Sequence, residues 1–70
     1  MAEFLKFTIG NTQHWINLSE VCFVRVVRKD ETALDMVQFT YAGGQVEAFG
    51  EQSGAKEALK ALEDHANAEP

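Results

Sequence analysis

The sequence is poor in the groups that usually reinforce a small domain. Cys22 is its only cysteine, so the chain cannot form an intramolecular disulfide. The two histidines, His14 and His65, do not combine with Cys22 in the spacing of zinc ligands, so we expect no structural metal. A chain of 70 residues buries only about 60% of its unfolded surface. Association with a second subunit is the reinforcement that is left, and we therefore expect a homo-oligomer, most simply a dimer.

Long hydrophobic runs and a surplus of positive charge are also missing. The longest uncharged apolar stretch, 21–24, is far shorter than the roughly 20 residues that span a bilayer. The first residues lack the basic region and the long apolar core of a signal peptide. Together with the lone thiol, this predicts a reducing cytoplasm and no membrane partner. The net charge of −5 argues against general binding to a phosphate backbone.

What the sequence has is a clear change of hydrophobic period. Its 46% hydrophobic content excludes a disordered chain. Alternation of apolar and polar residues predicts strands, and a period of 3.6 residues after residue 52 predicts a helix. The predicted strands are about 4–9, 13–18, 21–28, 34–41 and 45–49, and the predicted helix is about 52–66. We therefore expect one α+β domain over residues 1–70, an antiparallel meander of four to five strands followed by a C-terminal helix packed on one sheet face.

Glycines and caps mark the ends of these elements. Gly10-Asn11 and Gly43-Gly44 fit tight hairpin turns, because glycine accepts the positive φ that such turns need. Ser19-Glu20 interrupts the apolar pattern and predicts a bend or a single helical turn. Ser53 is a candidate N-cap for the helix, although residue 50 or 51 could also begin it.

The segment 21–28 has the highest β-branched content and is apolar on both faces. Phe23 and Val27 share one face, broken only by Arg25. The other face holds Cys22, Val24 and Val26. This pattern predicts a central strand covered on both sides, with Cys22 as a buried, unreactive thiol. One helix cannot cover both faces, so the uncovered face is expected to meet another molecule.

The buried core is expected to combine one face of each strand with the apolar stripe of the helix. Within the strand 34–41 the bulky face of Val37, Phe39 and Tyr41 is expected to point inward. The predicted core residues are Leu5, Phe7, Ile9, Ile16, Val24, Val26, Val37, Phe39, Leu59 and Leu62.

No group of residues has the pattern of a catalytic or cofactor-binding site. His14 alternates with apolar residues and has no nucleophile or carboxylate close to it in the sequence, so we interpret it as structural. His65 stands near the expected C-terminal end of the helix, where a cation favours the helix dipole. Gly43-Gly44 is not followed by the Lys-Ser or Lys-Thr of a phosphate-binding loop. We therefore predict no enzyme activity, no cofactor and no bound metal.

Two interpretations of the uncovered face are open. In the first, Trp15, Phe23, Arg25 and Val27 form an interface with a second copy or another protein, and the chain is a non-enzymatic interaction module. In the second, Arg25, Arg28 and Lys29 contact single-stranded nucleic acid, with the neighbouring aromatic residues stacking on bases. The acidic total charge favours the first interpretation.

The order of elements is similar to that of two known domain types. Strands, glycine turns and one terminal helix resemble the four-strand-plus-helix unit of single-stranded-DNA coactivator and Whirly-type domains, which pair as dimers. The run Ile16-x-Leu18-x-x-Val21, followed by strands, Gly43-Gly44 and a helix, resembles the layout of LytTR response-regulator domains. Basic DNA-contacting positions of these families have a counterpart here only in the cluster from Arg25 to Lys29. The resemblance is one of topology.

Overall fold

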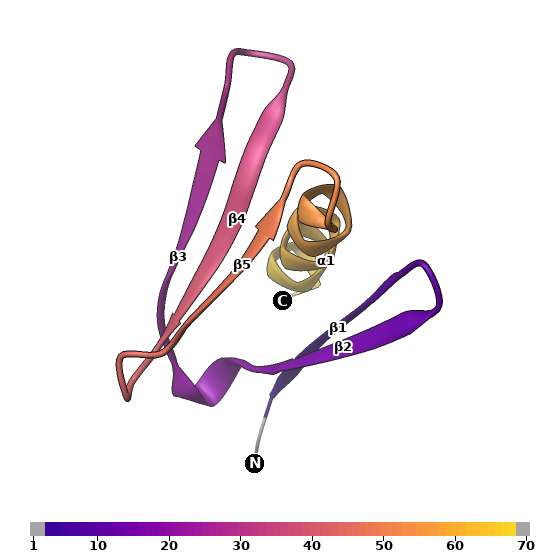
Figure 1. Ribbon diagram of the computed structural model, residues 1–70. Coiled ribbons are helices and arrows are strands. Elements are labelled where there is room, and N and C mark those ends of the chain that lie inside the picture. The colour runs from indigo at the N-terminus through magenta and orange to yellow at the C-terminus, as the bar shows by residue number, and fades with distance from the viewer. Residues whose placement is uncertain (1–2, 69–70) are drawn as a thin grey trace.

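The chain folds as five antiparallel strands followed by one C-terminal helix, which confirms the predicted α+β class (Figure 1). The coordinates are a computed structural model that describes residues 3–68. The ends of the expected 1–70 domain, 1–2 and 69–70, lie outside the described residues. The elements are β1 (Phe4–Ile9), β2 (Thr12–Asn17), a 3-10 turn η1 (Leu18–Glu20), β3 (Val21–Arg28), β4 (Leu34–Tyr41), β5 (Val46–Gly50) and α1 (Ala55–Asn67).

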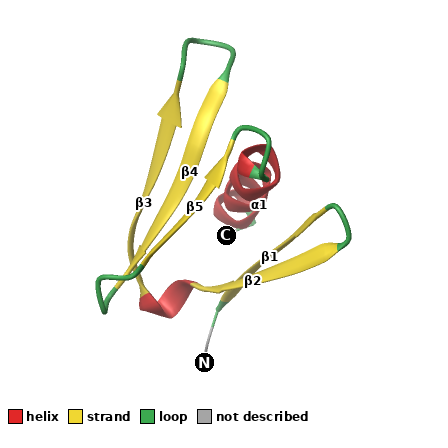
Figure 2. Cartoon of the chain, in the orientation of Figure 1, coloured by secondary structure: helices red, strands yellow, loops and turns green. Residues whose placement is uncertain are grey.

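The strands form two separate sheets, where the sequence predicted one meander. β1 and β2 make a two-stranded sheet, and β3, β4 and β5 make a three-stranded sheet in the order β3-β4-β5. The chain passes from one sheet to the other through η1 (Figure 2). The Asn17 side chain accepts a hydrogen bond from the Ser19 backbone N–H at 3.1 Å and so fixes this turn. The predicted helical turn at Ser19-Glu20 is therefore present, and it divides the sheet.

The β1–β2 hairpin follows from its turn and its alternation. Gly10 has a φ of 61°, which suits the first central position of a two-residue hairpin turn. Leu5 pairs with Ile16 and Phe7 pairs with His14, so these side chains share one face. Leu5, Phe7 and Ile16 are buried on that face. The hairpin is thus half-buried, as its period of two residues predicts.

Helix α1 lies between the two sheets and contacts β1, β4 and β5 (Figure 1). Its alanines make this close packing possible, because Ala55 and Ala58 are fully buried with little side-chain bulk. Within residues 3–68, no helix is long and apolar enough to cross a membrane. The helix begins at residue 55, later than the predicted 52, and Ser53 is not its cap. The N-cap is Gly54, in a left-handed conformation with no side-chain hydrogen bond.

An aromatic cluster joins the two sheets, which share no strand pairing among the described residues. Phe49 on β5 packs edge-to-face against Phe7 of the hairpin, with ring centroids 5.2 Å apart. It also meets the ring of His14 at 5.4 Å and that of Phe39 at 6.0 Å. His14 stacks on Phe7 at 5.5 Å. Such aromatic pairs contribute about 0.5–1.5 kcal/mol each beyond their buried area, so this cluster is a main tie between the sheets.

The predicted core is partly confirmed. Leu5, Phe7, Ile16, Val37 and Phe39 are buried as expected. Four further members, Ile9, Val24, Leu59 and Leu62, are only partly buried against this core. Val26 is 38% exposed, so its assignment to the core was wrong. Among residues 3–68, the buried hydrophobic residues absent from the prediction are Leu34, Phe49, Ala55 and Ala58.

The Leu34 error has a local cause. The β3–β4 register shifts between Val27 and Arg28, so that Arg28 lies opposite Leu34 while Val27 lies opposite Met36. A shift of this kind changes which face a side chain occupies. Strict alternation along 34–41 therefore assigned Leu34 to the outer face, whereas it is buried.

Tyr41 provides a spectroscopic test of the inner face, since it is the only tyrosine in the chain. Its hydroxyl donates a hydrogen bond to Glu47 Oε1 at 2.8 Å. Burial, and then this bond and the Glu47 charge, raise the pKa of Tyr41 to about 12. The folded pKa exceeds the unfolded value of about 10, so this contribution to stability is complete below pH 10 and is lost as the pH rises through 12. We expect tyrosinate absorbance to show a midpoint near 12.

A matched variant separates the two causes of this shift. Glu47→Gln removes the carboxylate charge and leaves the burial of Tyr41 in place, so the pKa should fall but stay above 10. The protein in denaturant provides the unperturbed reference. A midpoint near 10 with an intact circular dichroism spectrum would contradict the buried, hydrogen-bonded position of Tyr41.

Candidate interaction surface

Strand β3 is an edge strand of its sheet, and the prediction that it is central and covered on both sides was wrong. Phe23 is 50% exposed and Val26 is 38% exposed, although they lie on opposite faces of the strand. The reason is that α1 contacts β4 and β5 but leaves the inner face of β3 at the margin of the core. The most apolar strand of the chain is therefore also its least covered one.

The outer face of the three-stranded sheet is set by the strand register. Across the sheet, Phe23 lies opposite Thr40, which lies opposite Val46. The next row joins Arg25, Gln38 and Ala48. Val46 is 54% exposed, so apolar side chains mark both edges of this face. The predicted face of Phe23, Arg25 and Val27 thus exists and lies away from the helix.

The open edge of β3 also presents backbone hydrogen-bonding groups. The Tyr41 N–H donates to the Gln45 carbonyl at 2.8 Å, on the β5 side of β4. Backbone groups alternate in direction along a strand, so the groups of Thr40, Gln38 and Met36 point to β3. Their partners Phe23, Arg25 and Val27 accordingly point to β4.

The N–H and C=O groups of Val24 and Val26 therefore point to the open edge. An edge of this kind is a template for a further strand, and soluble proteins usually protect it with charges, proline or bulges. In the middle of β3, the charged residue that protects the open edge is Arg25, which stands between Val24 and Val26. The sequence already showed how apolar these residues are, but not that their backbone groups lack a neighbouring strand.

Trp15 does not belong to this surface. It lies on β2, in the other sheet, and not on a strand beside β3 as expected. It is 55% exposed on the outward side of the hairpin. There it packs against the ring of Phe4 with centroids 6.1 Å apart, under the Lys6 ammonium 5.1 Å from the indole centroid.

The cations Arg25, Arg28 and Lys29 do not form one cluster in space. Arg25 stands on the outer face with its guanidinium 5.9 Å from the Phe23 ring centroid. Lys29 forms an exposed ion pair with Glu51 at 2.6 Å, and this hydrogen bond raises the pKa of Lys29. Arg28 shares the face of Val24 and Val26 and lines a groove on the helix side of the sheet.

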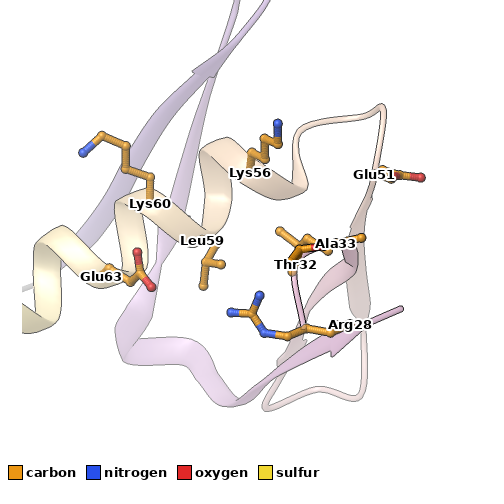
Figure 3. Close-up of a pocket in the computed structure, with 9 residues that line it drawn as sticks. Arg28, Thr32, Ala33, Glu51, Lys56, Leu59, Lys60 and Glu63 are labelled. Atoms are coloured by element: carbon orange, nitrogen blue, oxygen red, sulfur yellow. The ribbon is translucent and has the colours of Figure 1, made fainter. Parts of the chain in front are cut away.

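This groove, of about 490 Å³, lies between the β3–β4 connection and α1. Figure 3 shows Arg28 extending toward Leu59, while Lys56 and Lys60 point away from it on the far side of the helix. Glu51 and Glu63 also line the groove. The two lysines point away from Arg28, and two carboxylates line the same groove. The groove therefore does not direct its positive charges at one bound anion.

The remaining polar candidates have structural positions. His65 Nε2 lies 3.1 Å from Glu3 Oε2 and so links the helix to the segment before β1. Cys22 is exposed, so the expectation of a buried thiol was wrong. It sits where the β3–β4 register shifts between Val21 and Phe23. Among residues 3–68, no three His, Cys, Asp or Glu side chains gather as they would around a metal ion.

Comparison with models of protein families, with curated proteins and with solved structures finds no match to this chain. The similarity to coactivator, Whirly-type and LytTR domains is therefore one of element order alone. Function has to be argued from the open edge of β3 and the outer face beside it.

Proposed function

We propose that the chain is a non-enzymatic protein-interaction module that forms a homodimer through β3. The observation that supports this most is the combination found on one strand: high apolar content, exposure on both faces and an unpaired edge. Adding a strand to such an edge satisfies its backbone groups and covers its side chains in one step. A cytoplasmic location is part of the proposal, since Cys22 is exposed as a free thiol.

The size of the domain supports a second copy as the partner. In residues 3–68 the small core is reinforced neither by a disulfide nor by a cluster of metal ligands. Domains of this size commonly gain stability through association. Two copies also meet with the same surface, and β3 is self-complementary when it runs antiparallel to itself.

Single-stranded nucleic-acid binding is the alternative function. It depended on Arg25, Arg28 and Lys29 acting together, and these side chains point to different surroundings. Of the three, Arg25 alone lies beside an exposed aromatic ring. Binding of this kind should fall steeply with added salt and drop in Arg25→Ala. Titration of a labelled oligonucleotide at several salt concentrations tests it directly.

The dimer is tested by mass in solution. At tens of micromolar, sedimentation equilibrium should give twice the 7.8 kDa chain mass, with dissociation on dilution. Phe23→Lys places a second cation beside Arg25 on β3 and removes an exposed ring. Interface residues of this importance contribute more than about 1 kcal/mol, so the dissociation constant should rise by about fivefold or more.

Trp15→Lys is the matched control for Phe23→Lys. Both substitutions replace a ring that is about half exposed with a lysine, but Trp15 lies on the other sheet. It should leave the dissociation constant unchanged. A wild-type protein that stays at 7.8 kDa at these concentrations would overturn the proposal.

A further inference from the structure

We infer that two copies pair through β3 in one antiparallel register, with Val24 opposite Val24 of the second copy, and so build a continuous six-stranded sheet. This inference rests on the proposed homodimer and specifies its geometry. It begins from the backbone: the N–H and C=O groups of Val24 and Val26 point to the open edge. In the inferred register Val24 exchanges both hydrogen bonds with its counterpart, while Val26 lies opposite Cys22 of the second copy, the residue at which the β3–β4 register shifts.

Length and charge select this register among those that two-fold symmetry allows. Pairing centred on Phe23 or Val26 overlaps only five residues of β3, 21–25 or 24–28. Pairing centred on Val24 or Arg25 overlaps seven, 21–27 or 22–28, and both spans include Cys22, where the β3–β4 register shifts. The Arg25-centred register sets two guanidinium groups directly opposite each other, which is destabilising. The Val24-centred register is therefore the long pairing without a like-charge contact.

In the same register, the side chains of the two β3 strands complement each other. It brings Arg25 opposite Phe23 of the second copy on the outer face, twice by symmetry. Within one chain the Arg25 guanidinium already lies 5.9 Å from the Phe23 ring, so this cation–π contact is extended across the interface. One step beyond the paired residues, Glu20 approaches Arg28 of the second copy, an acidic residue beside a basic one. The strand is thus matched to itself in both charge and shape.

A cysteine scan along β3 reads the register directly. In a Cys22→Ser background, single cysteines are placed at Phe23, Val24, Arg25 and Val26. Opposite residues in a hydrogen-bonded antiparallel pair have Cα atoms about 5.5 Å apart, within the range of a disulfide. In the Val24-centred register the cysteines at Phe23 and Arg25 lie about 8 Å from their counterparts, and those at Val26 about 14 Å.

Under mild oxidation, Val24→Cys should therefore become a covalent dimer on a denaturing gel. The other three variants should stay largely monomeric at the same concentration. Fastest cross-linking at Phe23, Arg25 or Val26 would overturn the register. A doubled mass in sedimentation with no cross-link at any position would overturn pairing through β3 while leaving a homodimer in place. A single-chain mass would overturn both.

Val26→Pro provides a second test that does not depend on disulfide geometry. Proline removes the Val26 N–H, which points to the open edge and so is not part of the β3–β4 ladder. The monomer fold should be kept, as judged by circular dichroism, while the dimer is lost. Arg25→Pro is the contrasting variant, because the Arg25 N–H points to β4 and its loss should disturb the fold itself. A Val26→Pro protein that remains fully dimeric would contradict the inference.

Discussion

Replacing Phe49 with alanine is expected to remove a large part of the free energy of unfolding of the protein. Phe49 is 5% exposed and its ring meets those of Phe7, His14 and Phe39. Truncating a buried phenylalanine to alanine costs about 3–5 kcal/mol. A domain of this size has a total stability of about 4–10 kcal/mol, so the substitution removes much of it.

The effect should be large because Phe49 connects the two sheets. Within residues 3–68 they share no strand pairing, and the chain passes from β2 to β3 through η1. Without the ring, Phe7 and His14 lose their partner on β5. The cavity would open where the hairpin meets the three-stranded sheet, and neighbouring backbone cannot close it without moving the hairpin. Urea unfolding monitored by circular dichroism measures the loss.

Two further variants provide stability losses with which the loss in Phe49→Ala can be compared. Phe49→Leu keeps much of the buried volume and should lose roughly 1–2 kcal/mol, so it should remain folded. Phe4→Ala makes the same deletion at a ring that is 49% exposed on the outward side of the hairpin. It should change stability by less than about 1 kcal/mol. Equal effects of Phe49→Ala and Phe4→Ala would contradict the bridging role of Phe49.

The strands were predictable because each carries a pattern that local chemistry explains. Alternation in β1 and β4, the glycine turns at Gly10 and Gly44, and the change of period before α1 all act over a few residues. The hairpins followed from these signals. Local signals do not say which strands end up in one sheet, so the division at η1 was missed.

The candidate surface shows the same limit. That β3 is apolar on both faces was visible in the sequence, and it correctly indicated apolar surface beyond what one helix covers. The pattern of a buried central strand and that of an uncovered edge strand are, however, the same in sequence. Only the sheet order distinguishes them, and it also moved Trp15 away from Phe23. The basic cluster divided because side chains alternate along β3. Arg25 lies on the outer face, whereas Arg28 shares the face of Val24 and Val26 and lines the groove beside the helix.

The start of α1 was placed too early because its determinant is a tertiary contact. The sequence offered Ser53 as a cap, whereas the chain enters the helix through Gly54 with a φ of 107°. A β-carbon on Gly54 would lie 2.6 Å from Ile9 Cγ1 and would overlap Ile9 Cδ1. The glycine is thus needed both for its conformation and for the approach of the hairpin to the helix.

Gly54→Ala is accordingly expected to lower stability by about 3 kcal/mol. Placing alanine in a left-handed conformation costs about 1–2 kcal/mol, and overpacking against Ile9 adds a similar amount. For a domain of this size the melting temperature should fall by on the order of 15 °C. Gly43→Ala is the matched control, because no atom lies within 4 Å of its β-carbon position and its φ is not positive. That variant should stay within about 0.5 kcal/mol of the wild type.

A double-mutant cycle with Ile9→Ala separates the two contributions at Gly54. Removing the Ile9 side chain relieves the overlap but leaves the unfavourable φ, so the cost of Gly54→Ala should fall to about 1–2 kcal/mol in the Ile9→Ala background. If the cost of Gly54→Ala were the same in both backgrounds, the hairpin would not contact the helix N-terminus as the structure has it. A smaller cost in the Ile9→Ala background would instead show that the contact between Ile9 of the hairpin and Gly54, and not only the φ of Gly54, fixes where α1 begins.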